Sequence, residues 1–222
     1  MIDLVRDAGI DVRPARDGVK PANRLDGVAI ISRDVSKEDL VAIGGIPSVG
    51  LGVAAMTAAA RLDLEYAVAV MDAALGRGLP QEALEDVAHR WTSTKGMRLA
   101  TRHLTHARVG AESPLESISR VRLVKRGLPE PLLQHEFRDA HGFVGRVDMW
   151  WREWCVIGEA DGLGKYDDIA VLRREKVRED RLRALGMTVV RWTWDEMWNA
   201  PGDVVARILA AKSLRSRSRN AG

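Results

Sequence analysis

The period of the apolar residues changes after Gly127, and this change restricts the fold more than any other feature of the sequence. Before Gly127 the apolar residues follow helical spacing. After it they alternate with polar residues, as in strands that bury one face. The strands that this alternation predicts are 132–138, 143–151 and 155–159. The turn sequence Asp139-Ala140-His141-Gly142 joins the first two into a hairpin.

Helices flank these strands. The first begins after Ser113, a suitable N-cap, with Pro114 at its first position, and it ends at Gly127. Beyond the strands the sequence predicts a long charged helix, a strand and a last helix, over 168–185, 188–194 and 203–211. The order αβββαβα predicts an α/β (α+β) domain in which helices flank a mixed sheet.

The same patterns divide the chain into four segments. They are an N-terminal segment of unclear fold (1–46), a helical region (47–109), the αβββαβα domain (110–212) and a basic tail that we expect to be disordered (213–222). The N-terminal segment contains one strand-like run, 27–32. The helices expected in the helical region are 53–61, 64–75, 80–91 and 95–107.

Composition excludes several classes of protein. Cys155 is the single cysteine, so the chain forms neither an intrachain disulfide nor a cysteine-based zinc site. Glycines and a proline interrupt the longest apolar stretch, 41–60, which therefore lacks the roughly 20 unbroken apolar residues of a membrane span. Charged residues at the start are unlike a signal peptide. We therefore expect a cytoplasmic protein with no membrane partner.

Three acidic residues converge at one end of the predicted sheet. Side chains alternate along a strand, so Glu159 and Asp161 point to the same face. Asp148 lies near the end of the preceding strand, and a hairpin-like return would bring it close to Glu159. These three residues are our candidates for catalysis and for binding a metal.

Carboxylates this close repel one another, and a cation is one way to neutralise them. Hard oxygen ligands favour Mg²⁺ or Mn²⁺, and such an ion can promote attack on a phosphodiester. The structural alternative is that Asp148 and Asp161 are strand-end or turn residues and that Glu159 pairs with an arginine.

The long charged helix is unusual on the face expected to be buried. If Val171, Leu182 and Leu185 form its apolar stripe, Glu175 and Arg178 occupy the middle of that stripe. We expect these two residues to border a polar site, although a structural salt bridge would also account for them. The neighbouring lysines, Lys165 and Lys176, are candidates for stabilising charge on a cleaved phosphate.

Two basic segments contain no acid and are candidate DNA contacts. The candidate residues are Lys95, Arg98, Arg102 and Arg108 in the first, and Arg215 and Arg217 in the second. The alternatives are a solvated helix face and a disordered tail. His103 and His106 form a weak candidate pair that we expect on a solvated or phosphate-facing surface. The exposed member of Trp150 and Trp151 is a further candidate for DNA contact.

Five ordered motifs across about half of the chain resemble the very-short-patch-repair-like endonuclease domain of the PD-(D/E)XK superfamily. The motifs are Glu112-Ser-Pro-Leu-Glu-Ser117, Gly145-Arg-Val-Asp148, Gly158-Glu-Ala-Asp-Gly162 with Lys165-Tyr166, Glu175-Lys-Val-Arg-Glu-Asp180 and Leu185-Gly-Met-Thr-Val-Val-Arg-Trp-Thr-Trp194. The resemblance implies a restriction-endonuclease-like core with Glu116, Asp148 and Glu159 as ligands of Mg²⁺ or Mn²⁺.

Asp161 departs from the pattern of that superfamily, which has a lysine two positions after the glutamate. Three explanations stay open: Lys165 or Lys176 supplies the missing cation, Asp161 is itself a metal ligand, or catalysis has been lost. The helical region 64–108 resembles the linker half of abortive-infection type IV antitoxin-like proteins.

The sequence thus supports two functional hypotheses. One is a metal-dependent DNA endonuclease or nickase of phage, defence or repair biology. The other is a catalytically inactive protein of antitoxin or regulatory type that binds DNA or a protein. DNA is the expected partner in the first, and a protein partner or a homodimer is compatible with both.

Overall fold

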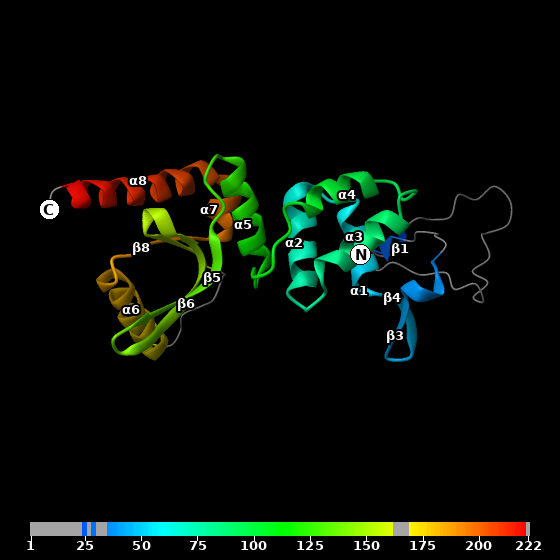
Figure 1. Cartoon of the computed structure of the whole chain (residues 1–222), viewed down its shortest axis with the longest axis horizontal. Coiled ribbons are helices and arrows are strands. Elements are labelled where there is room, and N and C mark those ends of the chain that lie inside the picture. The colour runs from blue at the N-terminus through cyan, green and yellow to red at the C-terminus, as the bar shows by residue number, and fades with distance from the viewer. Residues whose placement is uncertain (1–23, 26–27, 30–34, 162–168, 221–222) are drawn as a thin grey trace.

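The computed structural model describes residues 24–25, 28–29, 35–161 and 169–220, with side chains over 35–161 and 173–214. The chain forms a helical half and an α/β half, which meet where helix α2 lies beside helix α5 (Figure 1). No described helix is both long enough and apolar enough to cross a bilayer.

The helical half contains the four helices expected from the sequence. They are α1 (Leu51–Ala59), α2 (Leu64–Leu75), α3 (Gln81–Arg90) and α4 (Met97–Leu104). Their core is built largely from alanine and methionine, with Met56 and Met71 completely buried. Gly96 is required between α3 and α4, because its φ is 87° and an added Cβ would collide with the Ala60 carbonyl group.

Short strands precede this helical bundle. Strands β1 (Arg24–Leu25) and β2 (Val28–Ala29) pair in the N-terminal segment, where the strand predicted over 27–32 lies mostly outside the described residues. A 3-10 turn (Lys37–Asp39) then leads into the hairpin of β3 (Leu40–Ile43) and β4 (Ile46–Val49). This hairpin was not predicted, although Gly44 and Gly45, with φ of 59° and 81°, are typical of its tight turn.

The α/β half confirms the predicted fold class and begins with α5 (Pro114–Lys125), which Ser113 caps as expected. A four-stranded sheet follows in the order β5-β6-β7-β8, antiparallel except for the parallel pair β7 and β8. Its strands are β5 (Leu132–Asp139), β6 (Gly142–Trp151), β7 (Val156–Ala160) and β8 (Thr188–Trp192). A 3-10 turn (Arg152–Trp154) joins β6 to β7, and α6 (Ile169–Ala184) joins β7 to β8.

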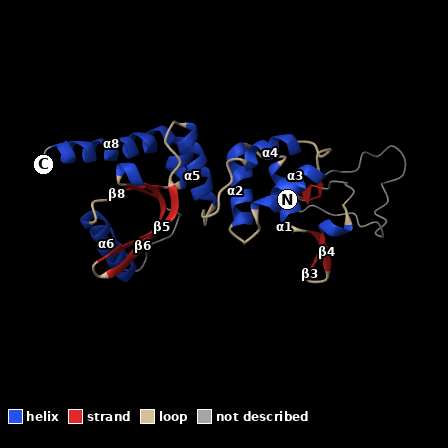
Figure 2. Cartoon of the chain, viewed as in Figure 1, coloured by secondary structure: helices blue, strands red, loops and turns tan. Residues whose placement is uncertain are grey.

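The sheet is packed on both faces (Figure 2). On one face, Met149, Trp151 and Trp192 form a core with residues of α5 and of the last helix, α8 (Pro201–Asn220). On the other face, Leu182 of α6 packs against residues that include Ile157. Successive residues of β7 therefore alternate between an α5/α8 face and an α6 face.

The end of the domain differs from the prediction. Strand β8 stops at Trp192, because Thr193 and Glu196 form a capping box that starts α7 (Trp194–Asn199). Trp194 is thus helical and not the end of a strand. Helix α8 continues to Asn220, beyond Ala211, so the backbone of most of the expected disordered tail is helical.

A buried ion pair joins the two halves. Arg120 on α5 and Asp72 on α2 lie 3.0 Å apart, with 2% and 0% of their side chains exposed. The same Arg120 guanidinium donates to the His106 carbonyl at 2.7 Å and to Glu130 at 2.6 Å. Asp72 also accepts a hydrogen bond from the Arg108 amide at 2.7 Å. These bonds tie α2, the segment after α4 and α5 together.

Candidate functional site

The strand register brings Asp148 and Glu159 together on the α6 face of the sheet. Met149 of β6 pairs with Gly158 of β7, so Asp148 and Glu159 are the next residues outward. The Asp148 carboxylate accepts a hydrogen bond from the Ala160 amide at 2.8 Å through Oδ2. The structure thus places these two acids side by side, at the point where β6 and β7 separate.

Glu116 reaches the same place from the first turn of α5. Its carboxylate is buried, and Oε2 accepts hydrogen bonds from the Glu112 amide at 2.9 Å and from Gln134 Nε2 at 3.0 Å. Gln134 has a φ of 51°, an uncommon left-handed conformation within β5, and its side chain bonds to Glu116. Glu116 is therefore held by the protein and is not a freely moving surface residue.

Asp148 has an unusual ionisation. Burial raises its pKa to about 7, the negative charges of Glu116 and Glu159 add to this effect, and the Ala160 hydrogen bond and Arg178 oppose it. Among the described residues, no lysine or arginine forms an ion pair with Asp148. Within the described residues, a backbone amide and no cation thus binds the Asp148 carboxylate.

Glu159 has the opposite environment, because two arginines bind its carboxylate. Arg178 of α6 donates to Oε1, and Arg191 of β8 donates to Oε2 at 3.1 Å. Both arginines also bind Glu175, Arg178 at 2.7 Å and Arg191 at 2.5 Å, and Arg191 binds Glu179 at 2.5 Å. Glu159 therefore lies in an ion-pair network with α6. This agrees with the alternative prediction that Glu159 pairs with an arginine.

Asp161 lies at the rim of this network. Its carboxylate is 3.9 Å from Arg191 Nε, and its amide donates to the Trp192 carbonyl at 2.9 Å. Burial raises the pKa of Asp161, with the Arg191 charge acting against it. The structure therefore associates Asp161 with Arg191 and β8.

The donor set fits a divalent cation at Glu116 and Asp148. Glu116 is buried and Asp148 is half-buried, and Mg²⁺ is commonly held by one or two carboxylates together with substrate phosphates. The four-residue set of Glu116, Asp148, Glu159 and Asp161 does not assemble, because arginines bind Glu159. Within the described residues, no three His, Cys, Asp or Glu side chains are arranged to hold a metal ion.

The other predicted site residues are dispersed. Lys176 is exposed on α6, whereas Lys165 lies outside the described residues, as do the side chains of Arg215 and Arg217. Lys95, Arg98 and Arg102 are exposed in the helical half. Arg108 instead binds carbonyl groups of its own turn and lies 3.6 Å from Glu130, so it forms part of the junction between the halves.

Two aromatic expectations need correction or refinement. His103 is buried, and burial lowers its pKa, so it does not lie on the solvated or phosphate-facing surface that we expected. Trp151 is in the core, whereas Trp150 is half-buried and stacks on His135 at 4.2 Å. Part of the Trp150 ring surface is thus already covered by the protein.

Sequence reasoning missed two residues of the site. Gln134 gave no signal, because a polar residue on an alternating strand is ordinary. In the sequence, Arg191 is only one residue of the motif that ends at Trp194, although it lies directly opposite Glu159 in the parallel pairing of β7 and β8. That register depends on the crossover through α6 and cannot be read from local sequence.

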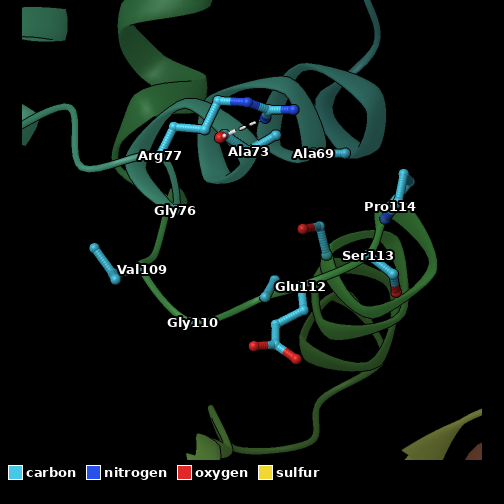
Figure 3. A pocket seen from close by; sticks show the side chains of 11 residues that line it. Ala69, Ala73, Gly76, Arg77, Val109, Gly110, Glu112, Ser113 and Pro114 are labelled. Atoms are coloured by element: carbon cyan, nitrogen blue, oxygen red, sulfur yellow. Dashed lines mark hydrogen bonds between the residues drawn. The ribbon is translucent and has the colours of Figure 1, made fainter.

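A separate pocket of about 400 Å³ lies between α2 and the start of α5 (Figure 3). Arg77 lies along its α2 wall and donates to the Ala73 carbonyl at 3.0 Å. On the α5 side, Ser113 Oγ already accepts from the Glu116 amide, and Glu112 pairs with Arg146. The side chains of Arg77, Ser113 and Glu112 in this pocket are thus already bonded within the protein.

Comparison with known proteins identifies relatives of undetermined function. The chain is 31% identical over 169 residues to the uncharacterized proteins MT2308 and Rv2248 from two strains of Mycobacterium tuberculosis. The aligned region is 76% of this chain and 61% of each relative, so the match spans less than two thirds of the relatives' length. No protein-family model matches the chain, and no solved structure matches it significantly.

Proposed function

We propose that residues 110–212 act as a metal-dependent DNA endonuclease or nickase, with Glu116 and Asp148 as its metal-binding residues. The observation that carries this proposal is the half-buried Asp148 carboxylate, which lies beside other acids and has no ion-pair partner among the described residues. The motif order and the sheet order of the α/β half are compatible with the resemblance to PD-(D/E)XK nucleases.

The two acids would have distinct tasks. Glu116 is preoriented by Gln134 and the Glu112 amide through Oε2, and no described group binds Oε1, which would take a cation. Asp148 is oriented through Oδ2 and can lose or hold a proton at Oδ1 near neutral pH. Cation binding is therefore linked to loss of a proton from Asp148. When bound there, Mg²⁺ or Mn²⁺ would polarise a phosphoryl oxygen of DNA.

DNA would contact the protein through basic side chains. Lys176 is exposed on α6, next to Glu175 of the ion-pair network. Lys95, Arg98 and Arg102 are exposed on the helical half and are candidates for binding phosphates farther from the acids. A cytoplasmic location is part of this proposal, as is a role in phage, defence or repair biology.

One observation favours a second candidate function. Both oxygens of Glu159 are bound by arginines, and an aspartate occupies position 161, so the site could have lost catalysis while keeping the fold. The protein would then bind DNA or a protein partner as an antitoxin-like or regulatory protein, alone or as a homodimer.

Incubation of the purified full-length protein with supercoiled plasmid separates the two candidates. We expect nicking in Mg²⁺ or Mn²⁺, no nicking in EDTA, and loss of nicking in Asp148→Ala. The control variant is Asp180→Ala, which removes an aspartate that is 59% exposed on α6. If the wild-type protein binds DNA but nicks it neither in Mg²⁺ nor in Mn²⁺, the nuclease hypothesis is rejected. That result would support the second candidate, a catalytically inactive binding protein.

A further inference from the structure

Arg178 extends from α6 over strand β6 at Gly145. A Cβ added at position 145 would lie 2.5 Å from Arg178 Nε and 3.1 Å from Cδ, so any other residue there would displace the arginine. The Arg178 side chain is 19% exposed and runs from α6 across β6 toward β7. Its path therefore depends on a glycine in a strand, where glycine is otherwise unfavourable.

Several acceptors hold the end of this side chain. Arg178 Nη2 donates to Glu159 Oε1 and to the Arg146 carbonyl at 3.1 Å, and Nη1 donates to Glu175 at 2.7 Å. A planar guanidinium held at three points is much better fixed than an ordinary surface ion pair. Arg178 is thus held against the α6 face of the sheet beside the acidic residues.

The position of this positive charge has a consequence for Glu159. With Arg178 on one oxygen and Arg191 on the other, each Glu159 oxygen already accepts from an arginine, and both positive charges oppose a metal ion at this carboxylate. Arg191 approaches from the neighbouring strand, whereas Arg178 comes from helix α6 and lies over β6 at Gly145. Arg178 is therefore the partner that can be removed without changing the sheet.

We propose that Arg178 is a positioning residue that occupies Glu159 in the metal-free protein and competes with a divalent cation for it. This inference rests on the proposed function, because it concerns the metal bound at Glu116 and Asp148. Moving Arg178 away frees an oxygen of Glu159 and removes a positive charge beside the bound cation. Both effects strengthen cation binding.

Mn²⁺ binding to the full-length protein tests this competition through the electron paramagnetic resonance signal of free Mn²⁺. Arg178→Met removes the charge and keeps a long apolar stem, whereas Gly145→Ala keeps the charge and pushes the arginine aside. We expect each to lower the Mn²⁺ dissociation constant by about fivefold or more, the order expected for removing one nearby charge.

Matched controls are Arg183→Met, which removes an arginine that is 62% exposed on the same helix, and Gly202→Ala, where an added Cβ meets nothing within 4 Å. Both should stay within about twofold of the wild type, the error expected for independent sites. Adding Glu159→Gln to Arg178→Met should abolish the gain. If Arg178→Met does not fold, Gly145→Ala decides the question.

Unchanged or weaker Mn²⁺ binding in Arg178→Met and Gly145→Ala would overturn the inference, as would a gain that persists without Glu159. Absence of Mn²⁺ binding in both wild type and Arg178→Met would also overturn it. Failure of the proposed function looks different, because the wild type then nicks no plasmid while the variants still bind Mn²⁺ more tightly.

Discussion

Replacement of Arg120 by methionine should strongly destabilise the protein. Asp72 would remain completely buried without its ion-pair partner, keeping the Arg108 amide and Ser117 as hydrogen-bond donors. Breaking a buried ion pair by removing one partner costs about 3–5 kcal/mol. That loss is a large part of the roughly 5–15 kcal/mol by which a domain is stable, so the variant should be close to unfolding.

Removing both charges should cost much less. In the double variant Asp72→Asn/Arg120→Met no charge is left buried, and the carboxamide oxygen introduced at position 72 can still accept from the Arg108 amide. Glu130, the other carboxylate that Arg120 binds, is 39% exposed and can be hydrated. We expect a loss of about 1–2 kcal/mol, the cost of the remaining unsatisfied groups. Urea unfolding followed by circular dichroism gives both values and completes a double-mutant cycle.

The pH dependence gives an independent check. Burial raises the pKa of Asp72 above its ordinary value of 3.8, and the Arg120 charge is the largest effect opposing it. A carboxyl with a raised folded pKa costs stability as pH rises from its unfolded pKa through its folded pKa. Loss of Arg120 raises the pKa further, so the penalty of Arg120→Met should be full at neutral pH and shrink toward pH 4. A penalty below about 1 kcal/mol at pH 7, or equal losses in the single and double variants, would refute this reasoning.

Three further predictions concern the α/β half. Gly158→Ala should cost about 1–3 kcal/mol in urea unfolding, because its Cβ would lie 2.5 Å from the Trp192 ring; an unchanged midpoint would contradict this packing. Ser113→Ala should cost about 1 kcal/mol, since it removes the N-cap of α5; no loss would mean that the cap is dispensable. Asp148→Asn should stabilise the metal-free protein by about 1–3 kcal/mol at pH 8, because a pKa of about 7 makes ionisation unfavourable. That gain should vanish below pH 4 in thermal unfolding, and a gain independent of pH would be inconsistent with it.

Local signals were sufficient for much of the α/β half. Ser113 and Pro114 marked the start of α5, and alternation from residue 132 onward gave β5, β6 and β7 within one or two residues. The same alternation was misleading at Trp192 and Trp194, where Thr193 and Glu196 start a helix. The capping-box spacing was present in the sequence, but two alternating tryptophans suggested a longer strand.

Long-range placement explains what the sequence could not provide. Arg191 meets Glu159 because the crossover through α6 sets a parallel register, and Arg178 reaches it because Gly145 leaves space. Neither fact follows from helical or strand periodicity. Asp72 and Arg120 are 48 residues apart and belong to helices whose local patterns predict only ordinary surface charges. Their pairing appears only when α2 packs against α5.

Asp148 is the residue on which the proposed function depends most directly. The decisive measurement is the initial rate of plasmid nicking in Mg²⁺ by the wild type, Asp148→Asn and the exposed control Asp180→Asn, at equal DNA occupancy. We predict metal-dependent nicking by the wild type and by Asp180→Asn, with a loss of about 100-fold or more in Asp148→Asn. Equal rates in the wild type and Asp148→Asn, or no nicking by any of the three proteins, would contradict the proposed function.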